Sequence, residues 1–218
     1  MPVKTDEKKS VKSKTMKNEK SPSKPTTDVP PKRIIKTLGR LGNEYAWLDK
    51  VLMDWGDGKA RETFIAGVPD GAFALPLLDN GNVVLVHSFR PFNHGWVYEL
   101  PGGIIDAGEC EEDAALRECE EEAGYKAKEL RKIAEYVLAP AMRCTIHLFV
   151  ATKLVKTKQR LDDAERGMTA HEFTPTQVYE MVLDGTIKDS QTIIAVLTAK
   201  ELGLLKVDPK EFTKGHPF

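Results

Sequence analysis

Runs of hydrophobic residues bounded by polar turns mark the first half of the chain as a β region. Five runs have the length of strands and are rich in aliphatic, β-branched and aromatic residues: 45–55, 61–68, 72–78, 83–89 and 96–100. The segments between them, such as 56-GDGK-59 and 79-DNGN-82, contain the Asp, Asn and Gly residues that turns favour. The pattern therefore predicts strands in succession up to Leu100.

The charged segment 111–123 is predicted to be a helix. Gly124 can end it, because glycine adopts the left-handed conformation of a C-cap. Further strands are predicted at 131–138, 144–154 and 171–173, with a loop over 155–170. Apolar positions at helical spacing predict helices at 175–185 and 190–203, and Ser190 is the expected N-cap of the second. The order of elements predicts a mixed β-sheet flanked by helices, an α+β protein with α/β/α layers.

Charge divides the chain into a basic tail and an acidic body. Residues 1–33 carry ten Lys and Arg against four Asp and Glu, a balance of +6, and the rest carries −7. The tail has few large apolar side chains, so we expect it to be disordered. It is either a solubilising extension or a polybasic arm that binds RNA, although no aromatic residue among its lysines supports base stacking.

The cysteines and the hydropathy pattern exclude several classes of protein. Cys110, Cys119 and Cys144 form neither a CxxC pair nor a Cys/His ligand pattern, so no disulfide framework or zinc site is predicted. A reducing, cytoplasmic location is expected. No window approaches about eighteen uninterrupted apolar residues, and the N-terminus lacks the apolar core of a signal peptide, so we expect no membrane association.

The candidate chemistry lies in the acidic helix 111–123. Glu118, Glu121 and Glu122 fall at helical spacing on one face, whereas Leu116, Cys119 and Ala123 face elsewhere, toward the sheet. Like charges this close repel, and a hard divalent cation such as Mg²⁺ compensates them with a shell of oxygen ligands. The alternative interpretation is a solvated charged face, which is common on Glu-rich helices.

The surroundings of the helix favour a cation site. The segment 101-PGG-103 follows a predicted strand, and 106-DAGE-109 leads tightly into the helix. A backbone carbonyl and the Glu109 side chain could therefore face the carboxylates. Arg117 lies beside them and can orient them through its rigid fork of donors.

These residues resemble the signature of the Nudix family. The matching positions are Gly103, Glu109, Arg117, Glu118, Glu121, Glu122 and Gly124, at the spacings of that signature. Every charged and glycine position matches, and only the two aliphatic positions differ, where Cys119 and Tyr125 stand. The resemblance implies a Nudix fold, which is an α/β/α sandwich. It also implies an enzyme that uses Mg²⁺ or Mn²⁺ to hydrolyse a nucleoside diphosphate linked to another moiety.

The resemblance also implies residue roles. Glu118, Glu122 and the carbonyl of Gly102 are the implied metal ligands, and Glu121 is a further ligand or orients the attacking water. Glu109 and Arg117 are implied to organise the site. The stretch 83–103 resembles ADP-ribose and ADP-sugar pyrophosphatases, in which residues at the positions of Arg90 and Glu99 contact the substrate.

The acidic segment 161-LDDAE-165 occupies the place of a loop that completes the site in those enzymes. By this resemblance Asp163 is a candidate general base and Glu165 a candidate metal ligand. An exposed acidic loop without such a role is the alternative interpretation. The stretch 139-APAMRCT-145 departs from the subfamily because it has neither Gly nor an acid, which leaves the specificity for the distal sugar open.

The N-terminal β region in that subfamily pairs with a second subunit and helps to hold the adenine. A homodimer is therefore implied, and Trp47 is a candidate for stacking on the substrate, with packing in the core as the alternative. The expected segments are the tail 1–33, the β region 34–75, the Nudix catalytic domain 76–205 and an extension 206–218.

The expected activity is hydrolysis of ADP-ribose or a related ADP-sugar to AMP and a sugar phosphate. Two alternatives stay open. One is hydrolysis of another nucleotide, such as NADH, FAD, a nucleoside triphosphate or a capped RNA end. The other is a nucleotide- or RNA-binding Nudix module that uses the basic tail.

Overall fold

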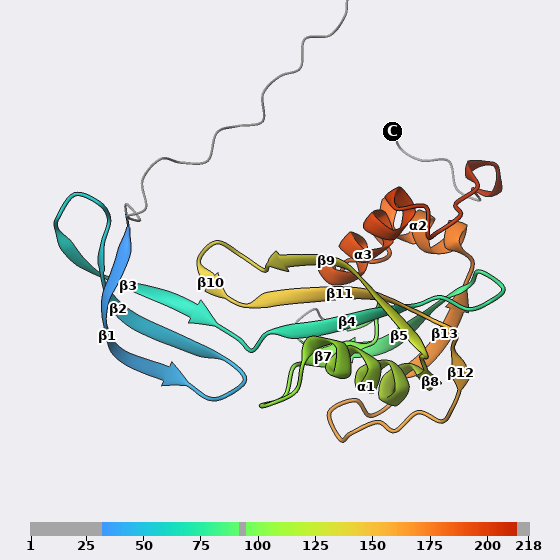
Figure 1. Ribbon diagram of the computed structural model, residues 1–218, viewed down its shortest axis with the longest axis horizontal. Helices are drawn as coiled ribbons and strands as arrows, with labels where there is room; N and C mark the ends of the chain where they lie inside the picture. Colours follow the sequence, from blue (N-terminus) through green and yellow to red (C-terminus); the bar gives the residue numbers. More distant parts are fainter. Residues whose placement is uncertain (1–31, 92–94, 213–218) are drawn as a thin grey trace, which may run out of the picture.

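The computed structural model describes residues 32–91 and 95–212. Within them the chain forms three α-helices and four sheets (Figure 1). The disorder and the RNA-binding role considered for the tail concern residues outside the described part, apart from Lys32 and Arg33. No helix in the described ranges is both long and apolar enough to cross a membrane.

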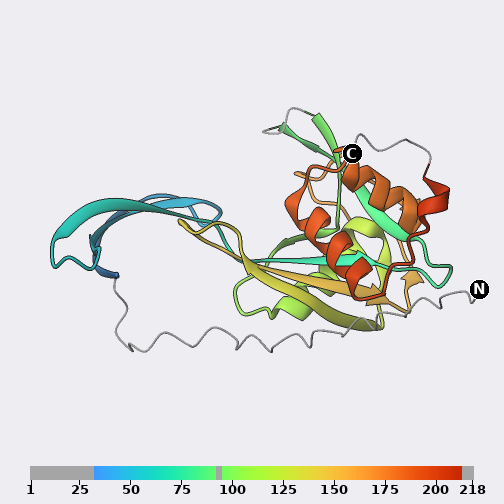
Figure 2. The ribbon, with the colours of Figure 1, turned by 90° about the horizontal axis from the view of Figure 1, so that it is seen from above.

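An N-terminal sheet projects from the body of the molecule (Figure 2). Its strands β1 (Arg33–Gly42), β2 (Trp47–Asp54) and β3 (Ala60–Gly67) are antiparallel, and the short β10 (Met142–Arg143) pairs in parallel with β3. β1 was not predicted from the sequence. Its register shifts twice against β2, which breaks the two-residue alternation on which strand prediction depends.

The central sheet has the strand order β7-β4-β11-β9 and mixes parallel with antiparallel pairs. Its strands are β4 (Gly71–Pro76), β7 (Gly102–Ile104), β9 (Glu129–Val137) and β11 (Thr145–Thr152). The third sheet, β13-β5-β6, consists of β5 (Val83–Arg90), β6 (Gly95–Glu99) and β13 (Thr169–Phe173). A two-stranded pair joins β8 (Tyr125–Lys126) to β12 (Val155–Lys156).

Helices cover both faces of the central sheet. α1 (Glu111–Ala123) packs on the face that carries Ala72 and Ala74, whereas α2 (Pro175–Leu183) and α3 (Ser190–Glu201) share the core that includes Leu75. A short 3₁₀ helix at Pro209–Glu211 follows α3. The α+β class and the expected α/β/α sandwich are confirmed.

The ends of the helices show which residues cap them. Gly124 ends α1 with φ of 71°, a left-handed conformation that glycine adopts without strain, as predicted. The predicted N-cap of α3 was wrong by one residue. Asp189 is the cap, because its carboxylate accepts a hydrogen bond from the Thr192 backbone N–H at 2.8 Å, and Ser190 begins the helix.

A buried carboxylate joins three strands of the N-terminal sheet, including β10, which leads directly into β11 of the central sheet. The Asp49 side chain is 1% exposed, and its carboxylate contacts the Arg40 guanidinium at 2.7 Å and that of Arg143 on β10 at 3.1 Å. A second Asp–Arg pair in the same sheet, Asp57 with Arg61 at 2.6 Å, lies on the surface with both side chains about half exposed.

Asp49→Asn is therefore expected to lower the midpoint of thermal unfolding more than Asp57→Asn does. The first change leaves two guanidinium groups without their anionic partner, whereas exposed pairs are screened by water. The measurement is thermal unfolding followed by circular dichroism for both variants and the parent. Equal midpoints for the two variants would show that the buried pair does not hold the sheet.

Candidate active site

Small buried residues let α1 approach the sheets closely. Ala114, Ala115, Cys119 and Ala123 are at most 3% exposed and lie in one hydrophobic cluster. The prediction that Cys119 and Ala123 face the sheet is confirmed. Leu116, expected on the same side, is only half-buried and lies outside that cluster.

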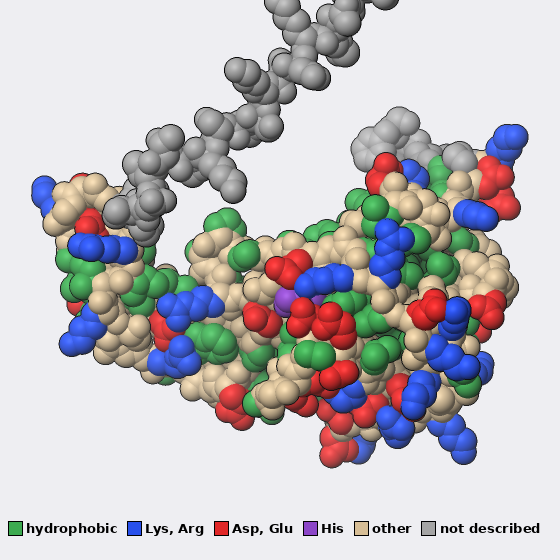
Figure 3. Space-filling model, viewed as in Figure 1, with side chains coloured by type: hydrophobic (Ala, Val, Ile, Leu, Met, Phe, Trp, Pro, Cys, Tyr) green, Lys and Arg blue, Asp and Glu red, His purple; other side chains and the backbone are tan. Residues whose placement is uncertain are grey.

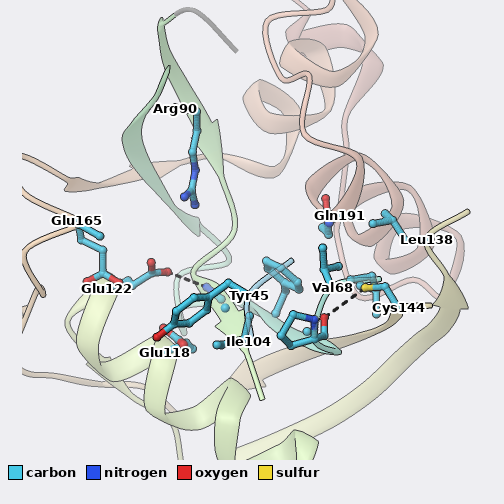
Figure 4. A pocket seen from close by; sticks show the side chains of 17 residues that line it. Tyr45, Val68, Arg90, Ile104, Glu118, Glu122, Leu138, Cys144, Glu165 and Gln191 are labelled. Carbon is cyan, nitrogen blue, oxygen red and sulfur yellow. Dashed lines mark hydrogen bonds between the residues drawn. The ribbon is translucent and has the colours of Figure 1, made fainter. Parts of the chain in front are cut away.

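Three carboxylates converge at the C-terminal half of α1. Glu118 and Glu122 are 7% and 3% exposed, and Glu165 reaches them from the loop before β13. One oxygen of each lies within 4.8 Å of the others, and Figure 4 shows Glu122 and Glu165 side by side. Carboxylate oxygens are the ligands that Mg²⁺ and Mn²⁺ prefer, so this trio is a candidate divalent-cation site.

The glycines of β7 bring the sheet against these carboxylates. The Gly102 backbone N–H donates a hydrogen bond to Glu122 Oε2 at 2.7 Å. A Cβ atom at Gly103 would lie 2.5 Å from Glu118 Oε1, and one at Gly102 would lie 2.3 Å from the Phe73 ring. A side chain at Gly102 would therefore clash with the Phe73 ring and the Ala72 backbone, and one at Gly103 would displace the Glu118 carboxylate. A ligand role for the Gly102 carbonyl stays a prediction.

Arg117 and Glu109 brace the cluster from one side. The Arg117 guanidinium makes a two-pronged contact with Glu109, with both distances at 3.0 Å, and contacts Glu118 at 2.8 Å. These contacts raise the pKa of Arg117 and lower that of Glu109, chiefly through the hydrogen bonds that join the two side chains. The arrangement suits the organising role expected for both residues.

Glu121 lies at the rim of the cluster. Its carboxylate is 3.5 Å from Arg117 and 3.6 Å from Arg160, and it is not one of the three that converge. Arg160 also contacts Glu120, at 3.4 Å. The acidic turn is therefore balanced in part by an arginine from the loop, which the sequence alone did not connect with α1.

The loop that supplies Glu165 is anchored on the end of α1. The Thr157 N–H donates to the Gly124 carbonyl at 2.7 Å, and the Gln159 side chain donates to the Glu122 carbonyl at 2.5 Å. Farther along, the Asp162 N–H donates to Glu165 Oε2 at 3.0 Å. These contacts fix both the helix end and the third carboxylate.

Burial gives the metal-free cluster an unusual protonation state. It raises the pKa of Glu122 to about 9, with smaller contributions from the charges of Glu118, Glu165 and Glu99, while the Gly102 N–H opposes the shift. Burial also raises the pKa of Glu118. A bound cation would offset this cost by placing positive charge beside the two carboxylates.

Arg90 and Glu99 form a second pair at the site. Arg90 contacts Glu99 Oε1 through Nη2 at 2.6 Å and through Nε at 2.9 Å, and the Ser88 hydroxyl donates to the same oxygen at 2.5 Å. Arg90 lines the cavity beside the carboxylates, whereas Glu99, 7% exposed, is not among the residues that line it. Glu99 therefore lies behind Arg90 and fixes its direction.

The structure separates two other predicted residues from the cluster. The Asp163 side chain is exposed, pairs with Arg166 at 3.4 Å and lines a neighbouring cavity. Trp47 packs on Gly67, where an added Cβ would lie 2.2 Å from its ring, and Arg40 lies 4.8 Å above that ring. Trp47 does not line the active-site cavity of its own chain.

Sequence analysis missed several residues that line the cavity of about 390 Å³, among them Tyr45, Leu138, Cys144 and Gln191. They come from a turn and from the ends of distant elements, so their proximity has no local signal. The departure of 139–145 from the subfamily pattern is the one hint the sequence contains.

The fold and the sequence resemble those of known proteins. A solved structure titled as an ADP compounds hydrolase matches with a TM-score of 0.70 and 17% identity, over 81% of this chain and 96% of the other. An ADP-ribose pyrophosphatase of Bacillus subtilis is 33% identical over 143 residues, 64% of this chain and 77% of the relative. A methanol dehydrogenase activator of Bacillus methanolicus is 28% identical over 166 residues, 75% of this chain and 90% of the relative.

The family assignment rests on the domain itself. The NUDIX domain matches residues 68–195, more than half of the chain, and the chain therefore belongs to the Nudix family. The family expected from the signature is confirmed.

Glu122→Gln should remove the pH dependence that this position contributes to the stability of the protein in the absence of a divalent cation. Between the ordinary carboxyl pKa of 4.5 and about 9, native Glu122 holds a proton that the unfolded chain has lost, so rising pH weakens the native state. Gln does not titrate and can still accept the Gly102 hydrogen bond. In EDTA, the variant is expected to gain stability relative to the parent as pH rises from about 6 to about 9.

The same thermal unfolding experiment with Mg²⁺ provides the control. Mg²⁺ should raise the unfolding midpoint of the parent protein, because it binds the native state, and should do so far less in the variant. A stability difference independent of pH, or equal stabilisation by Mg²⁺, would contradict the assigned site.

Proposed function

We propose that this protein hydrolyses the diphosphate bond of ADP-ribose or a related ADP-sugar, giving AMP and a sugar phosphate. The observation that carries this proposal is the convergence of Glu118, Glu122 and Glu165 beside Arg90, braced by Arg117. A binding module would have no need of three convergent carboxylates, two of them buried, because together they repel an anionic ligand unless a cation intervenes.

Mg²⁺ or Mn²⁺ is the cation that fits this donor set, and when bound it neutralises charge on the diphosphate and activates the attacking water. Arg90 is proposed to bind a phosphate oxygen. Its Nε and Nη2 contact Glu99, and no contact within the described residues uses Nη1. The orientation imposed by Glu99 directs the remaining donors toward the cavity.

Asp163 is the proposed general base. Of the two candidate groups, Glu121 is engaged by two arginines, Arg117 and Arg160, whereas Asp163 has one exposed partner, Arg166, and lines the cavity next to Glu165 and Arg90. A small movement of its loop would bring it toward the water. Glu121 then orients the water or supports the metal shell.

The three cysteines are all free, which suits a reducing compartment such as the cytoplasm, and we propose that location.

The N-terminal sheet is proposed to form a homodimer interface. It exposes an unusual number of large hydrophobic side chains: Ile34, Ile35, Leu38, Leu41, Tyr45, Leu48, Trp55 and Phe64. Figure 3 shows hydrophobic side chains between basic ones on this part of the surface.

The activity test is release of AMP from ADP-ribose and ADP-glucose with Mg²⁺. Glu118→Gln and Glu122→Gln are expected to lower kcat by about 10³-fold, since loss of a metal ligand removes several kcal/mol of transition-state stabilisation. Glu112→Gln is the matched control, because Glu112 is exposed on the same helix. Full activity in either of the first two variants would refute the proposed role of the cluster.

The dimer test is sedimentation equilibrium. The parent protein is expected to be a dimer and Leu41→Glu a monomer, because Leu41 is 77% exposed on the N-terminal sheet and a charge there opposes burial. Leu202→Glu, at an equally apolar exposed position after α3, should leave the dimer intact. A monomeric parent protein would exclude the interface.

A further inference from the structure

Thr192 is a fully buried polar residue in the first turn of α3. Its exposed fraction is 0%, and the other buried residues farther along the helix, Ala195, Val196 and Ala199, belong to the hydrophobic core. A hydroxyl is costly in such surroundings unless hydrogen bonds compensate the loss of water. The partners of this hydroxyl therefore indicate what the residue does.

The Thr192 hydroxyl joins the start of α3 to the chain that follows β6. The Leu100 backbone N–H donates to Thr192 Oγ1 at 2.9 Å, and the hydroxyl donates to Asp189 Oδ2 at 2.6 Å. Because a carboxylate only accepts, the hydroxyl proton belongs to Asp189, and a lone pair is left for Leu100. Asp189 also accepts from the Thr192 backbone N–H at 2.8 Å, which fixes the orientation of the pair.

The backbone that Thr192 holds lies between two parts of the active site. Glu99 comes directly before Leu100, is the last residue of β6 that pairs with β5, and contacts Arg90. Two residues after Leu100, the Gly102 N–H contacts Glu122. The Leu100 N–H is thus the first group beyond the β5–β6 ladder, and its hydrogen bond to α3 continues the support of the strand past its last pair.

Asp189 acts on the same pair of side chains through its charge. Burial raises the pKa of Asp189, while its hydrogen bonds with Thr192 and the positive charge of Arg90 oppose the shift. Gln191, in the same turn, lines the active-site cavity together with Arg90 (Figure 4). The start of α3 therefore acts on Arg90 and Glu99 in two ways, through the backbone after Glu99 and through a charge near Arg90.

We propose that Thr192, held by Asp189, is a positioning residue for the hydrolysis: it fixes the end of β6 so that Glu99 keeps the Arg90 guanidinium directed at the diphosphate. This inference rests on the proposed function and adds to it a buried residue that does not line the cavity. Without the hydroxyl, the buried Leu100 N–H has no acceptor, and its movement toward another one displaces Glu99. The carboxylate cluster stands on α1 and the loop before β13, so the response to Mg²⁺ should change less than substrate binding.

The test measures KM and kcat for ADP-ribose with Mg²⁺. Thr192→Val removes the hydroxyl at similar size and is expected to raise KM about tenfold, with kcat and the Mg²⁺ concentration for half-maximal rate within about threefold of the parent values. Thr192→Ser keeps the hydroxyl and should bring KM back to within about threefold. The matched control is Thr198→Val, the same change about 9 Å farther along the axis of α3, and it should leave KM unchanged.

A double-mutant cycle with Arg90→Lys separates positioning from a general loss of stability. Lysine keeps a positive charge but loses the two-pronged contact through which Glu99 orients Arg90. If Thr192 acts through that contact, Thr192→Val should raise KM by no more than about twofold in the Arg90→Lys background. A merely structural role would give the same factor in both backgrounds.

The outcomes distinguish this inference from the proposed function. Equal factors in the two backgrounds, or a KM of Thr192→Val equal to that of Thr198→Val, would overturn the inference and leave the proposed function intact. Absence of hydrolysis by the parent protein would overturn both. If Thr192→Val does not fold, Thr192→Cys takes its place in the cycle, because a thiol is a weaker donor and acceptor of similar size, and the same comparison of factors decides.

Discussion

Repulsion between the buried carboxylates of Glu118 and Glu122 is the constraint that the rest of the active site satisfies. A buried carboxylate is tolerated only when it is paired, hydrogen-bonded or protonated. Arg117 contacts Glu118, and the Gly102 N–H contacts Glu122. These partners leave the pKa of Glu122 near 9, so the compensation is incomplete without a cation. Incomplete compensation favours metal binding, because the site gains most from positive charge.

The same constraint determines the backbone around the site. Gly103 leaves room for the Glu118 carboxylate beside β7, and the small residues on the inner face of α1, alanines and Cys119, let the helix lie against the sheets. The loop at 157–165 is hydrogen-bonded to the end of α1 before it delivers Glu165. Hydrogen bonds therefore join α1 to β7 and to the start of the loop, which supports the convergence of the carboxylates.

Local pattern predicted much of this arrangement. The spacing of Glu118 and Glu122, the glycines before the helix and the Gly124 cap are all properties of neighbouring residues, and each is present in the structure. Other features depend on which distant segments meet. β1 was missed because its bulges disturb the alternation, and the contact of Arg160 with Glu120 and Glu121 joins residues far apart in the chain. Tyr45 and Gln191 likewise became visible only when the cavity was assembled.

The fold separates the acidic cluster from much of the recognition surface. The cluster stands on α1 and one loop, against β7, whereas Val68, Leu138 and Cys144 line the cavity where the N-terminal sheet joins the body. Arg143 binds Asp49 of that sheet, and the next residue, Cys144, lines the cavity. The turn between β1 and β2 adds Tyr45 to the same cavity. Changes in the N-terminal sheet can therefore alter the lining of the cavity while the carboxylates on α1 stay in place, so the two parts of the site can vary separately.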